Sequence, residues 1–400
     1  MSIANKLIAV SGSSGYEHWV SFLDTPDHER YYNIFTSTTG DIYTGYANLT
    51  AGRYYVVKQS PRGDTLWVKS YDYINIRAMG CCDPYGNVYI VGPSTSANNR
   101  VIVMKTNSEG DFLWAKELAF YNILAAPIIG GVGADADGNI YAVGTFGVVS
   151  TSKTAVAFKL NSQGVFQLAK SIAHNTNSST CALAVRGDTF VIGGNNVNDA
   201  GKRYRSKFDT TGNTIWAASD DHNPLAILFY DFAIDSNENV FGADKAWLTK
   251  YAPNGDLLWS YRYNTSSTSV MSKVCVDSSD NVFISDEYKI IKCDNDGNVI
   301  WANTTNLPIS DMKVDDEDSV IISGNTFFDS YGIWSAKLPG DGSGVGTYDS
   351  FTYSSSTATP TPQTLTVGST VTTNISTYSD STASITAQVE DVPIDVIQVI

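Results

Sequence analysis

Short runs of β-branched and aromatic residues alternate with tight polar turns along most of the chain. Gly86 to Gly92 reads Gly-Asn-Val-Tyr-Ile-Val-Gly, and similar residues fill Gly138 to Gly144 and Gly187 to Gly193. Turn residues that lead into Val, Ile, Tyr and Phe are typical of β-hairpins. A second kind of turn, such as Asn107 to Asp111, contains a glycine that can adopt a positive φ angle without steric cost. The pattern therefore predicts an all-β protein built from hairpins.

The hairpins belong to a repeat that is marked by the spacing Lys-x4-Gly-x3-Trp. Leu168 replaces the tryptophan in one copy, the last copy lacks it, and the N-terminal stretch adds Trp19 four residues after Gly15. Six steps lead from Trp19 to Trp301, which gives a period of about 47 residues. The lysines are Lys58, Lys105, Lys159, Lys207, Lys250, Lys292 and Lys337, and the other tryptophans are Trp67, Trp114, Trp216, Trp259 and Trp301.

A period of this length suits four short strands and their turns, the unit of a β-propeller. Seven first halves of the repeat can be counted, so we predict seven four-stranded blades. Eight blades are the alternative, if the N-terminal hairpin pairs with the C-terminal segment in a blade of its own. The first halves turn at Gly40, Gly86, Gly138, Gly187, Glu238, Asp280 and Asp318.

The two ends of the chain depart from the repeat. Residues 1–23 match only the second half of a repeat, and we expect this hairpin to close the ring of blades or to flank it. The propeller is predicted over residues 24–354. Residues 355–400 are Ser/Thr-rich, lack Lys and Arg, and form a β-rich C-terminal extension with weak strand patterns. Two interpretations of this extension stay open: an attachment arm, or a tail that pairs with sheet edges or closes the ring.

Each repeated residue type has a physical reason. The tryptophans should lie on the outermost strands and be largely buried, covering the seams between blades. Repetition in every blade favours a structural role for the lysines, each meeting a carboxylate of its own or a neighbouring blade and lying along the tryptophan. Small residues are expected on the innermost strands, with Phe35 and Lys313 as exceptions. The small residues are Cys81, Gly133, Ala182, Ala233 and Cys275.

Composition narrows the possible partners and compartments. The net charge of −15 argues against DNA, RNA or an anionic membrane as a partner. No secretory signal and no run of about 18 apolar residues is present, so we expect synthesis in a host cytoplasm, where Asn-x-Ser/Thr sequons mean little. An odd number of cysteines without framework spacing indicates reduced core residues. They are Cys81, Cys82, Cys181, Cys275 and Cys293.

Two aspartate pairs are weak candidates for a metal site. Asp135 with Asp137, and Asp294 with Asp296, resemble the start of calcium loops, where alternate carboxylates supply oxygen ligands. Neither pair is followed by the distant bidentate Glu of such a loop, and both occupy turn positions of the repeat. A turn is therefore the favoured interpretation. The adhesion tripeptide Arg62-Gly-Asp64 occupies the same kind of turn.

The sequence contains no catalytic constellation. His18, His28, His174 and His222 lie far apart and lack metal-ligand spacing, and no Ser-His-Asp or Cys-His arrangement is indicated. We therefore expect no enzymatic activity and no cofactor.

Three resemblances can be stated on these motifs. The element Asp-x-x-Gly-Asn-Val-Tyr-Ile-x-Gly resembles the seven-bladed β-propeller repeat family, whose members carry Gly-Asn-Ile-Tyr-Val-Thr-Gly, over about residues 35–337. The ending from Lys337 to Tyr353 is similar to virion structural proteins of marine tailed phages. The Gly-x3-Trp element is similar to the tryptophan repeat of quinoprotein dehydrogenases, but no copy has the departures that would build a cofactor pocket.

The phage resemblance implies a non-enzymatic virion protein of a tail, tail fibre or capsid vertex. Its partners would be other virion structural proteins in an oligomeric assembly and, for host attachment, a glycan or receptor on the host surface. The alternative is a bacterial surface or glycan-binding propeller, which would want a secretion signal. A propeller enzyme comes third, because it would need a charged, metal-competent pocket at the axis.

Overall fold

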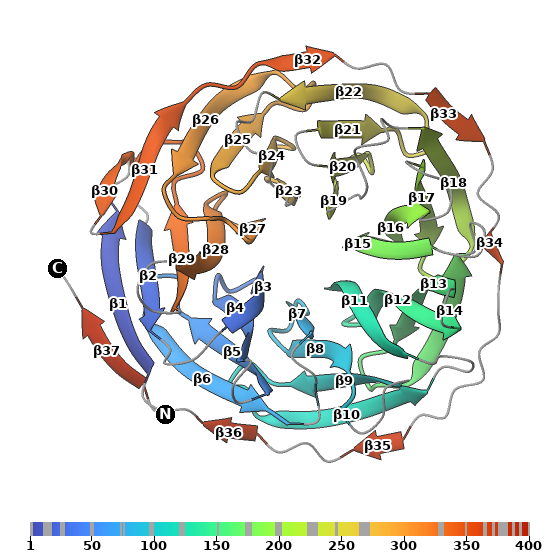
Figure 1. Ribbon diagram of the computed structural model, residues 1–400, viewed down its shortest axis with the longest axis horizontal. Coiled ribbons are helices and arrows are strands. Elements are labelled where there is room, and N and C mark those ends of the chain that lie inside the picture. The colour runs from blue at the N-terminus through green and yellow to red at the C-terminus, as the bar shows by residue number, and fades with distance from the viewer. Residues whose placement is uncertain are drawn as a thin grey trace. The chain divides into compact units, whose positions relative to one another are not determined.

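The computed structural model is a β-propeller of seven four-stranded blades, and every described element is a strand (Figure 1). This confirms the predicted fold class and the predicted number of blades. The described residues are 3–10, 18–24, 29–48, 52–72, 74, 77–95, 100–119, 125–149, 152–172, 178–196, 202–221, 231–244, 247–263, 273–326, 332–348, 350–362, 366–369, 373–374, 383–385, 389–391 and 394–398.

The chain divides into two compact units. Unit 1 contains Met1–Asp72, Tyr263–Thr361 and Gln388–Ile400, and unit 2 contains Tyr73–Arg262 and Pro362–Ala387. Three blades belong to unit 1 and four to unit 2. The boundary between the two units falls within the short strand β32 (Pro360–Pro362).

Two blades of unit 1 are continuous in sequence. The strands of each follow one another in antiparallel order within the sheet. The first comprises β3 (Glu29–Thr36), β4 (Ile42–Asn48), β5 (Arg53–Gln59) and β6 (Thr65–Tyr71). The second comprises β23 (Lys273–Val276), β24 (Val282–Ser285), β25 (Lys289–Cys293) and β26 (Val299–Thr305).

The third blade of unit 1 is assembled from both ends of the repeat array. Its first three strands are β27 (Asp311–Val314), β28 (Val320–Thr326) and β29 (Gly332–Leu338). The N-terminal hairpin of β1 (Ile3–Val10) and β2 (His18–Asp24) adds β2 antiparallel to β29. We call this sheet the composite blade. It contains the N-terminal hairpin, so that hairpin does not begin an eighth blade.

Unit 2 holds four blades that are continuous in sequence. They follow the same order of strands as the continuous blades of unit 1. Their strands are β7 (Met79–Cys82), β8 (Val88–Pro93), β9 (Arg100–Thr106) and β10 (Phe112–Ala119); β11 (Ala125–Ala134), β12 (Ile140–Val149), β13 (Ser152–Leu160) and β14 (Phe166–Ile172); β15 (Ser178–Arg186), β16 (Thr189–Asn196), β17 (Lys202–Asp209) and β18 (Thr214–Asp221); and β19 (Asp231–Ile234), β20 (Val240–Asp244), β21 (Trp247–Tyr251) and β22 (Leu257–Tyr263).

The first turn of every blade requires one residue in the left-handed region. All the turn positions counted in the sequence have a positive φ angle, between 54° and 79° at the glycines and between 60° and 63° at Glu238, Asp280 and Asp318. Non-glycine residues adopt this conformation rarely, so the turn, rather than the residue, dictates the backbone here. The first turns therefore fall at equivalent positions of the repeat in all seven blades.

Small side chains on the first strands allow neighbouring blades to approach closely. In unit 2, a Cβ added to Gly131 would lie 2.7 Å from the Cβ of Leu183 on the next first strand, and one added to Gly133 would lie 3.0 Å from Val185. Such distances leave no room for a larger residue. The exception Phe35 stacks on Tyr43 of its own blade, with ring centroids 5.3 Å apart.

The C-terminal extension supplies short strands that pair beyond the fourth strands of the chain's own blades. The described strands of this part of the chain are thus paired at sheet edges. In unit 1, β31 (Phe351–Ser356) pairs with β26 and β36 (Val389–Asp391) with β6. In unit 2, β33 (Thr366–Ser369), β34 (Thr373–Asn374) and β35 (Ala383–Ile385) pair with β18, β14 and β10.

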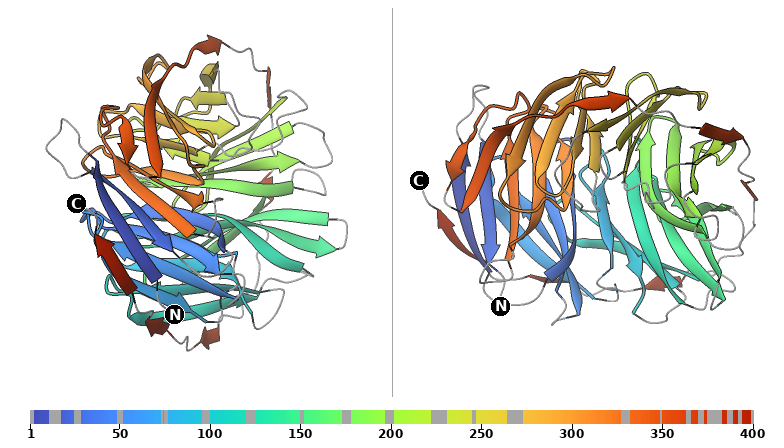
Figure 2. Two further views of the ribbon diagram at one scale, coloured as in Figure 1. Left: turned by 60° about the vertical axis from the view of Figure 1, so that its left-hand side comes forward. Right: turned by 45° about the horizontal axis from the view of Figure 1, so that its top comes forward.

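The composite blade is finished by both chain ends. Its fifth strand is β1, which lies antiparallel to β2, as the extension's strands do to the fourth strands of other blades. The last strand, β37 (Ile394–Gln398), then pairs parallel with β1, from Ile3 opposite Ile394 to Leu7 opposite Gln398. Figure 2 shows β37 beside β1. The strand β30 (Gly346–Tyr348) forms a hairpin with β31.

Candidate functional site

The repeated lysine and the repeated tryptophan meet in one pair per blade. The lysine lies on the third strand directly opposite the residue of the Trp position on the fourth strand, and Lys337 meets Trp19 across β29 and β2. The last copy of the repeat, which contains Lys337 but no tryptophan of its own, thus receives its tryptophan from the N-terminal hairpin. The other pairs are Lys58 with Trp67, Lys105 with Trp114, Lys159 with Leu168, Lys207 with Trp216, Lys250 with Trp259, and Lys292 with Trp301.

Each of these lysines also faces a carboxylate. The partner in most blades is an aspartate of the same blade's first turn. In the blade β15–β18 that turn is shorter, and Lys207 binds Glu238 of the next blade at 2.8 Å. The Nζ–carboxylate distances are 2.9 Å for Lys58–Asp41, 3.5 Å for Lys105–Asp83, 3.7 Å for Lys159–Asp135, 3.9 Å for Lys250–Asp235, 2.9 Å for Lys292–Asp277 and 2.8 Å for Lys337–Asp315.

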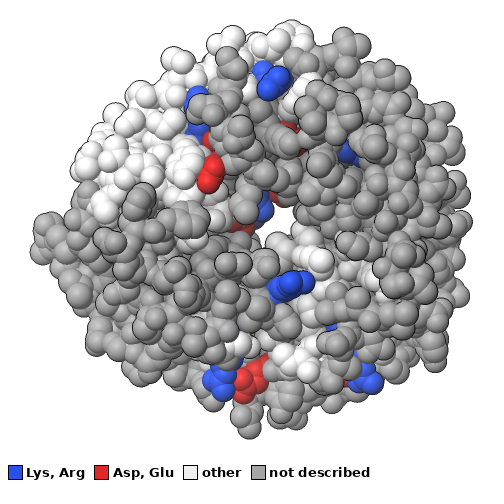
Figure 3. Space-filling model, in the orientation of Figure 1, with Lys and Arg blue, Asp and Glu red and all other residues white. Residues whose placement is uncertain are grey.

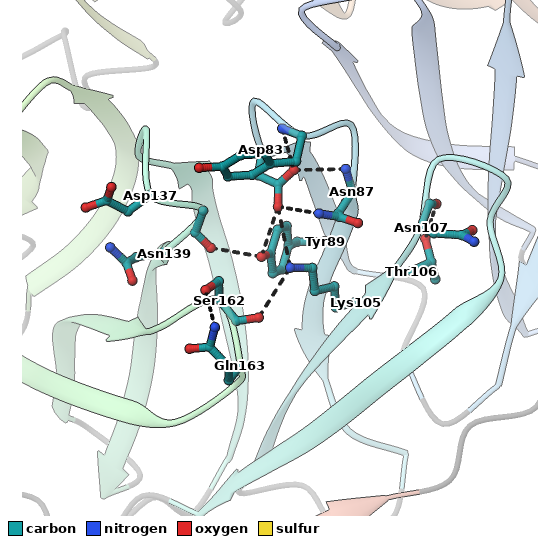
Figure 4. A network of polar contacts seen from close by, with 12 residues as sticks. Asp83, Asn87, Tyr89, Lys105, Thr106, Asn107, Asp137, Asn139, Ser162 and Gln163 are labelled. Carbon is teal, nitrogen blue, oxygen red and sulfur yellow. Dashed lines mark hydrogen bonds and ion pairs between the residues drawn. The ribbon is translucent and has the colours of Figure 1, made fainter.

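The joint then reaches into the next blade through a backbone carbonyl. Lys105 Nζ and Trp114 Nε1 both donate to the Ser162 carbonyl, at 3.2 and 3.3 Å. In unit 1, Lys292 and Trp301 share the Gly340 carbonyl in the same way, at 3.1 Å each. Figure 4 shows Asp83, Tyr89, Lys105 and Ser162 in this network.

Aromatic rings of the second strand complete the surroundings of the lysine. Lys105 Nζ lies 4.9 Å from the ring centroid of Tyr89, and Lys292 Nζ lies 4.8 Å from that of Phe283. A cation at this distance from a ring face is attracted by the ring quadrupole. Burial and the nearby Asp83 carboxylate raise the pKa of Tyr89, so its hydroxyl stays protonated. The ring partner of these lysines is thus the second-strand residue.

The tryptophans differ in burial. Trp19 and Trp216 are buried, whereas Trp67, Trp114, Trp259 and Trp301 are half-buried. Trp19 Nε1 donates to the Pro61 carbonyl at 3.1 Å, and Trp216 Nε1 to the Pro253 carbonyl at 2.9 Å. Gly255 packs against the Trp216 ring and Gly342 against the Trp301 ring so closely that a Cβ would lie 2.7–2.8 Å from the indole. The tryptophan therefore covers the second turn of the neighbouring blade, and that turn requires glycine.

The aspartates considered as metal ligands belong to turns. Asp135 Oδ1 accepts the N–H groups of Asp137 and Asn139 at 3.1 and 2.9 Å, and its Oδ2 accepts the Tyr141 hydroxyl at 3.0 Å. Asp294 Oδ1 likewise accepts the N–H groups of Asp296 and Asn298, at 3.0 and 2.8 Å. Among the described residues, no group of three His, Cys, Asp or Glu side chains is arranged to hold a metal ion.

Hydrogen bonds also set the ionisation of Asp294. Burial alone would raise the pKa of Asp294, but donation from Asn298, Asp296 N–H and Gly297 N–H lowers it below the usual value. For Lys337, burial would lower the pKa, but hydrogen bonds and charge from Asp315 and Glu317 raise it. Both groups are therefore held in their charged forms by local contacts.

Charged residues interrupt the regular pattern on the first strands of unit 1. Lys273 of β23 lies 3.4 Å from Asp311 of β27, whose other oxygen accepts the Ile34 N–H of β3 at 2.8 Å. Beside it, the Tyr54 hydroxyl donates to Asn33 Oδ1 at 2.6 Å. Burial and Asp311 raise the pKa of Tyr54. This group ties the first strands of three blades together, and sequence spacing did not indicate it.

A second irregular group lies in unit 2. Arg203 and Arg205 of β17 are fully buried, Arg203 is paired with Asp244, and the Arg205 guanidinium lies 3.8 Å from the Tyr251 ring centroid. Most blades have apolar residues on the corresponding stretch of the third strand. The two arginines that replace them in β17 were therefore the feature of the sequence that could have indicated this buried group. Both irregular groups are salt-bridged side chains that hold strands together.

The remaining candidates are placed as follows. His18 is buried in the composite blade. His28, His174 and His222 lie outside the described residues. Cys81, Cys275 and Cys293 are buried, and burial raises the pKa of the Cys293 thiol to about 12. Arg62 and Asp64 lie in a turn closed by hydrogen bonds to Ser60.

Among the described residues, charged side chains do not form one continuous patch on the face drawn in Figure 3. The described Lys, Arg, Asp and Glu residues show there at scattered points. In the part of the chain that the structure describes, no helix is long and apolar enough to cross a membrane.

No protein-family model and no curated protein sequence matches this chain. Similar solved structures share the fold at low identity. A catalytically inactive virginiamycin B lyase from Staphylococcus aureus, solved with quinupristin, is 11% identical over 80% of this chain and 99% of that chain, with a TM-score of 0.51. BBS1N in complex with ARL6DN is 11% identical over 80% and 97%, with a TM-score of 0.50. The Neurospora crassa Pan2 WD40 domain is 9% identical over 77% and 88%, with a TM-score of 0.49. At these identities the likeness shows the fold alone.

Proposed function

We propose that this chain is a non-enzymatic structural protein of a tailed-phage virion and acts through contacts with other virion proteins. The supporting observation is that the repeated polar side chains are used for contacts within and between blades. The lysines of the repeat contact carboxylates of the turns, and the N–H groups of Trp19, Trp114, Trp216 and Trp301 donate to backbone carbonyls of a neighbouring blade. Side chains used in such joints hold a rigid scaffold together, and this use supports a structural rather than a catalytic role.

The covered sheet edges support an assembly role. An exposed edge strand offers unpaired N–H and C=O groups to any other strand, and proteins held at high local concentration must limit such pairing. Here β36 covers part of β6, and β35 covers part of β10, through backbone pairing. A propeller with covered edges can be packed beside other subunits without adding strands to them.

The phage setting rests on the resemblance of the segment from Lys337 to Tyr353. The first part of this segment serves the blade joint, because the Gly340 carbonyl accepts Lys292 and Trp301. The hairpin of β30 and β31 that follows is not needed for the joint and lies beyond β26. That hairpin, where the chain leaves the repeat array, is the part we associate with the virion resemblance.

Mass spectrometry of purified particles from the source tests this proposal. We expect the chain to remain with the particles through washing in salt, at a constant ratio to other structural proteins, and to cross-link to a neighbouring virion protein. Its absence from washed particles would overturn the virion assignment. In that case, binding of the purified chain to a glycan array would support the bacterial surface or glycan-binding alternative.

A further inference from the structure

His18 occupies a repeat position that most other blades give to an aliphatic residue and one blade gives to Gln167. The residue before each tryptophan falls where the register between the third and fourth strands shifts, as in a β-bulge. At that position Leu66, Leu113 and Leu258 are 51%, 49% and 51% exposed, whereas His18 is only 2% exposed. The composite blade therefore buries a titratable ring at the position where continuous blades expose a neutral side chain.

The imidazole of His18 is buried without a hydrogen-bond partner. Neither Nδ1 nor Nε2 of this ring makes a hydrogen bond. The next residue, Trp19, pairs with Lys337 on β29, and His18 itself pairs with Val10 on β1. A buried ring nitrogen with no partner is costly when neutral and far more costly when charged.

The charged groups that act on His18 come from β29 and from two turns of the composite blade. Lys337 lies on β29, Asp315 and Glu317 lie in the turn between β27 and β28, and Asp341 lies in the turn after β29. Lys337 Nζ already binds Asp315 and Glu317, at 2.8 Å each. A proton on His18 would therefore place a second cation beside Lys337 and compete for the same carboxylates.

The balance of these groups favours the neutral ring. Burial and the Lys337 charge lower the pKa of His18, and Asp315, Asp341 and Glu317 oppose this shift without overcoming it. Once β2 leaves the sheet, the ring is in water and returns to its ordinary pKa of 6.5. Acid therefore stabilises the detached hairpin relative to the attached one.

We propose that His18 makes the closure of the composite blade acid-sensitive, so that proton uptake by its imidazole releases the hairpin of β1 and β2 from β29. This device is separate from the proposed virion role and holds for any function of the propeller. Below about pH 6.5 the ratio of detached to attached hairpin should rise about tenfold per pH unit, until the pKa of the attached state is reached. Detachment would uncover the edge of β29 together with Trp19, Val20 and Leu23.

Hydrogen exchange on the full chain tests this proposal. Amide exchange of β2 should be measured between about pH 7.5 and 5.5 and corrected for the intrinsic pH dependence of exchange, and we expect β2 protection to fall by up to about tenfold over this range. The matched internal control is β6, which occupies the same place in a continuous blade and carries Leu66 instead of histidine. Protection of β6 should stay constant.

Two variants assign the effect to the imidazole. His18→Leu restores the aliphatic residue of the repeat, and His18→Gln keeps a polar side chain that cannot titrate. Both should abolish the loss of β2 protection in acid, and the second remains informative if the first disturbs the bulge. Equal acid sensitivity in the wild type and in His18→Gln, or constant β2 protection in the wild type, would overturn the proposal.

Discussion

The blade β7–β10 and the composite blade contain the same lysine–tryptophan joint, but only the first is continuous in sequence. In β7–β10, Lys105 and Trp114 are neighbours in one hairpin, so closing the pair orders a short loop. In the composite blade, Lys337 meets Trp19 from the other end of the array. The composite pair is also more deeply buried, since Trp19 is 1% exposed whereas Trp114 is only half-buried.

This difference shows how the fold compensates for a long-range closure. Closing a longer loop costs more chain entropy, although the cost rises only slowly with length. The composite blade meets this cost with a fully buried tryptophan and a lysine held by both Asp315 and Glu317, where Lys105 has one carboxylate, Asp83. Four changes test the comparison, and they follow from the largest expected effect to the smallest.

Deleting residues 1–24 should have the largest effect, because it removes the fourth strand of the composite blade. Trp19, Val20 and Leu23 are almost completely buried, and burial of three such side chains contributes about 4 to 9 kcal/mol. A whole domain is stable by only about 5 to 15 kcal/mol, so we expect the truncated chain to lose its native fold or to aggregate. Circular dichroism during guanidinium unfolding and size-exclusion chromatography measure this.

The control for that deletion is a chain lacking residues 389–400, which loses β36 and β37 but keeps β2. It should remain folded. An N-terminal deletion that unfolds at the same guanidinium concentration as the full chain would show that the hairpin is an independent appendage.

Replacing one tryptophan in each of the two blades should have the next largest effect, and the loss of stability should differ between the blades. Trp19→Ala should cost about 3 to 5 kcal/mol of unfolding free energy, because it opens a cavity in a buried cluster and leaves the Pro61 carbonyl without its donor. Trp114→Ala should cost about half as much, because its ring is only partly buried. Chemical denaturation of both variants gives the comparison. Losses below about 1 kcal/mol at both sites would contradict the alignment of the blades.

Removing the C-terminal extension after β31 should have a moderate effect. The pairing strands are short, with two to four residue pairs each on β14, β10 and β18, so a truncated chain ending at 356 should keep its fold and melt a few degrees lower. The uncovered edges should instead cause concentration-dependent association. Light scattering across a dilution series measures this, and a chain ending at 388, which keeps β33, β34 and β35 on their edges, serves as the near-neutral comparison. A truncated chain that unfolds outright would make the extension part of the propeller core.

The smallest effect is expected for Asp294→Asn, in a second turn. Asp294 has a folded pKa below its usual value of 3.8, so its carboxylate adds stability above that pH, and this stability is lost as the pH falls through the folded pKa. The variant should lose less than about 1 kcal/mol near neutral pH, as is typical of an accessible hydrogen-bonded turn. Below pH 3.8 its stability should converge with that of the wild type. Thermal melts at several pH values would show convergence or its absence.

The repeat allowed much of this architecture to be predicted. The spacing Lys-x4-Gly-x3-Trp specifies a hairpin in which lysine and tryptophan lie opposite each other. The first turn recurs at a fixed place in the repeat, whether a glycine such as Gly40 or another residue such as Asp318 stands there. Such local rules act within about ten residues, so the sequence displays them directly. They also place the metal candidate Asp135 in a turn that uses its oxygens.

Long-range pairing was much less accessible from the sequence. The strand β34 spans only Thr373–Asn374. Two residues are too few to show a hydrophobic pattern, so the sequence could not predict its pairing with β14. Its place is fixed by which sheet edge remains open after the blades form. The same holds for Lys273 and Asp311, which are brought together by the packing of successive first strands and share no sequence spacing. The functional assignment depends on partners outside this chain and stays a proposal.

The composite blade also has a consequence for synthesis on the ribosome. The strand β2 leaves the ribosome roughly 300 residues before β29, and at about 5 to 20 residues per second this interval lasts on the order of 15 to 60 s. Throughout that time the nascent hairpin carries Trp19 and Val20 with no sheet to bury them. The strand β2 is thus made long before it can reach its native position, and a chaperone that shields its apolar side chains would act during this interval.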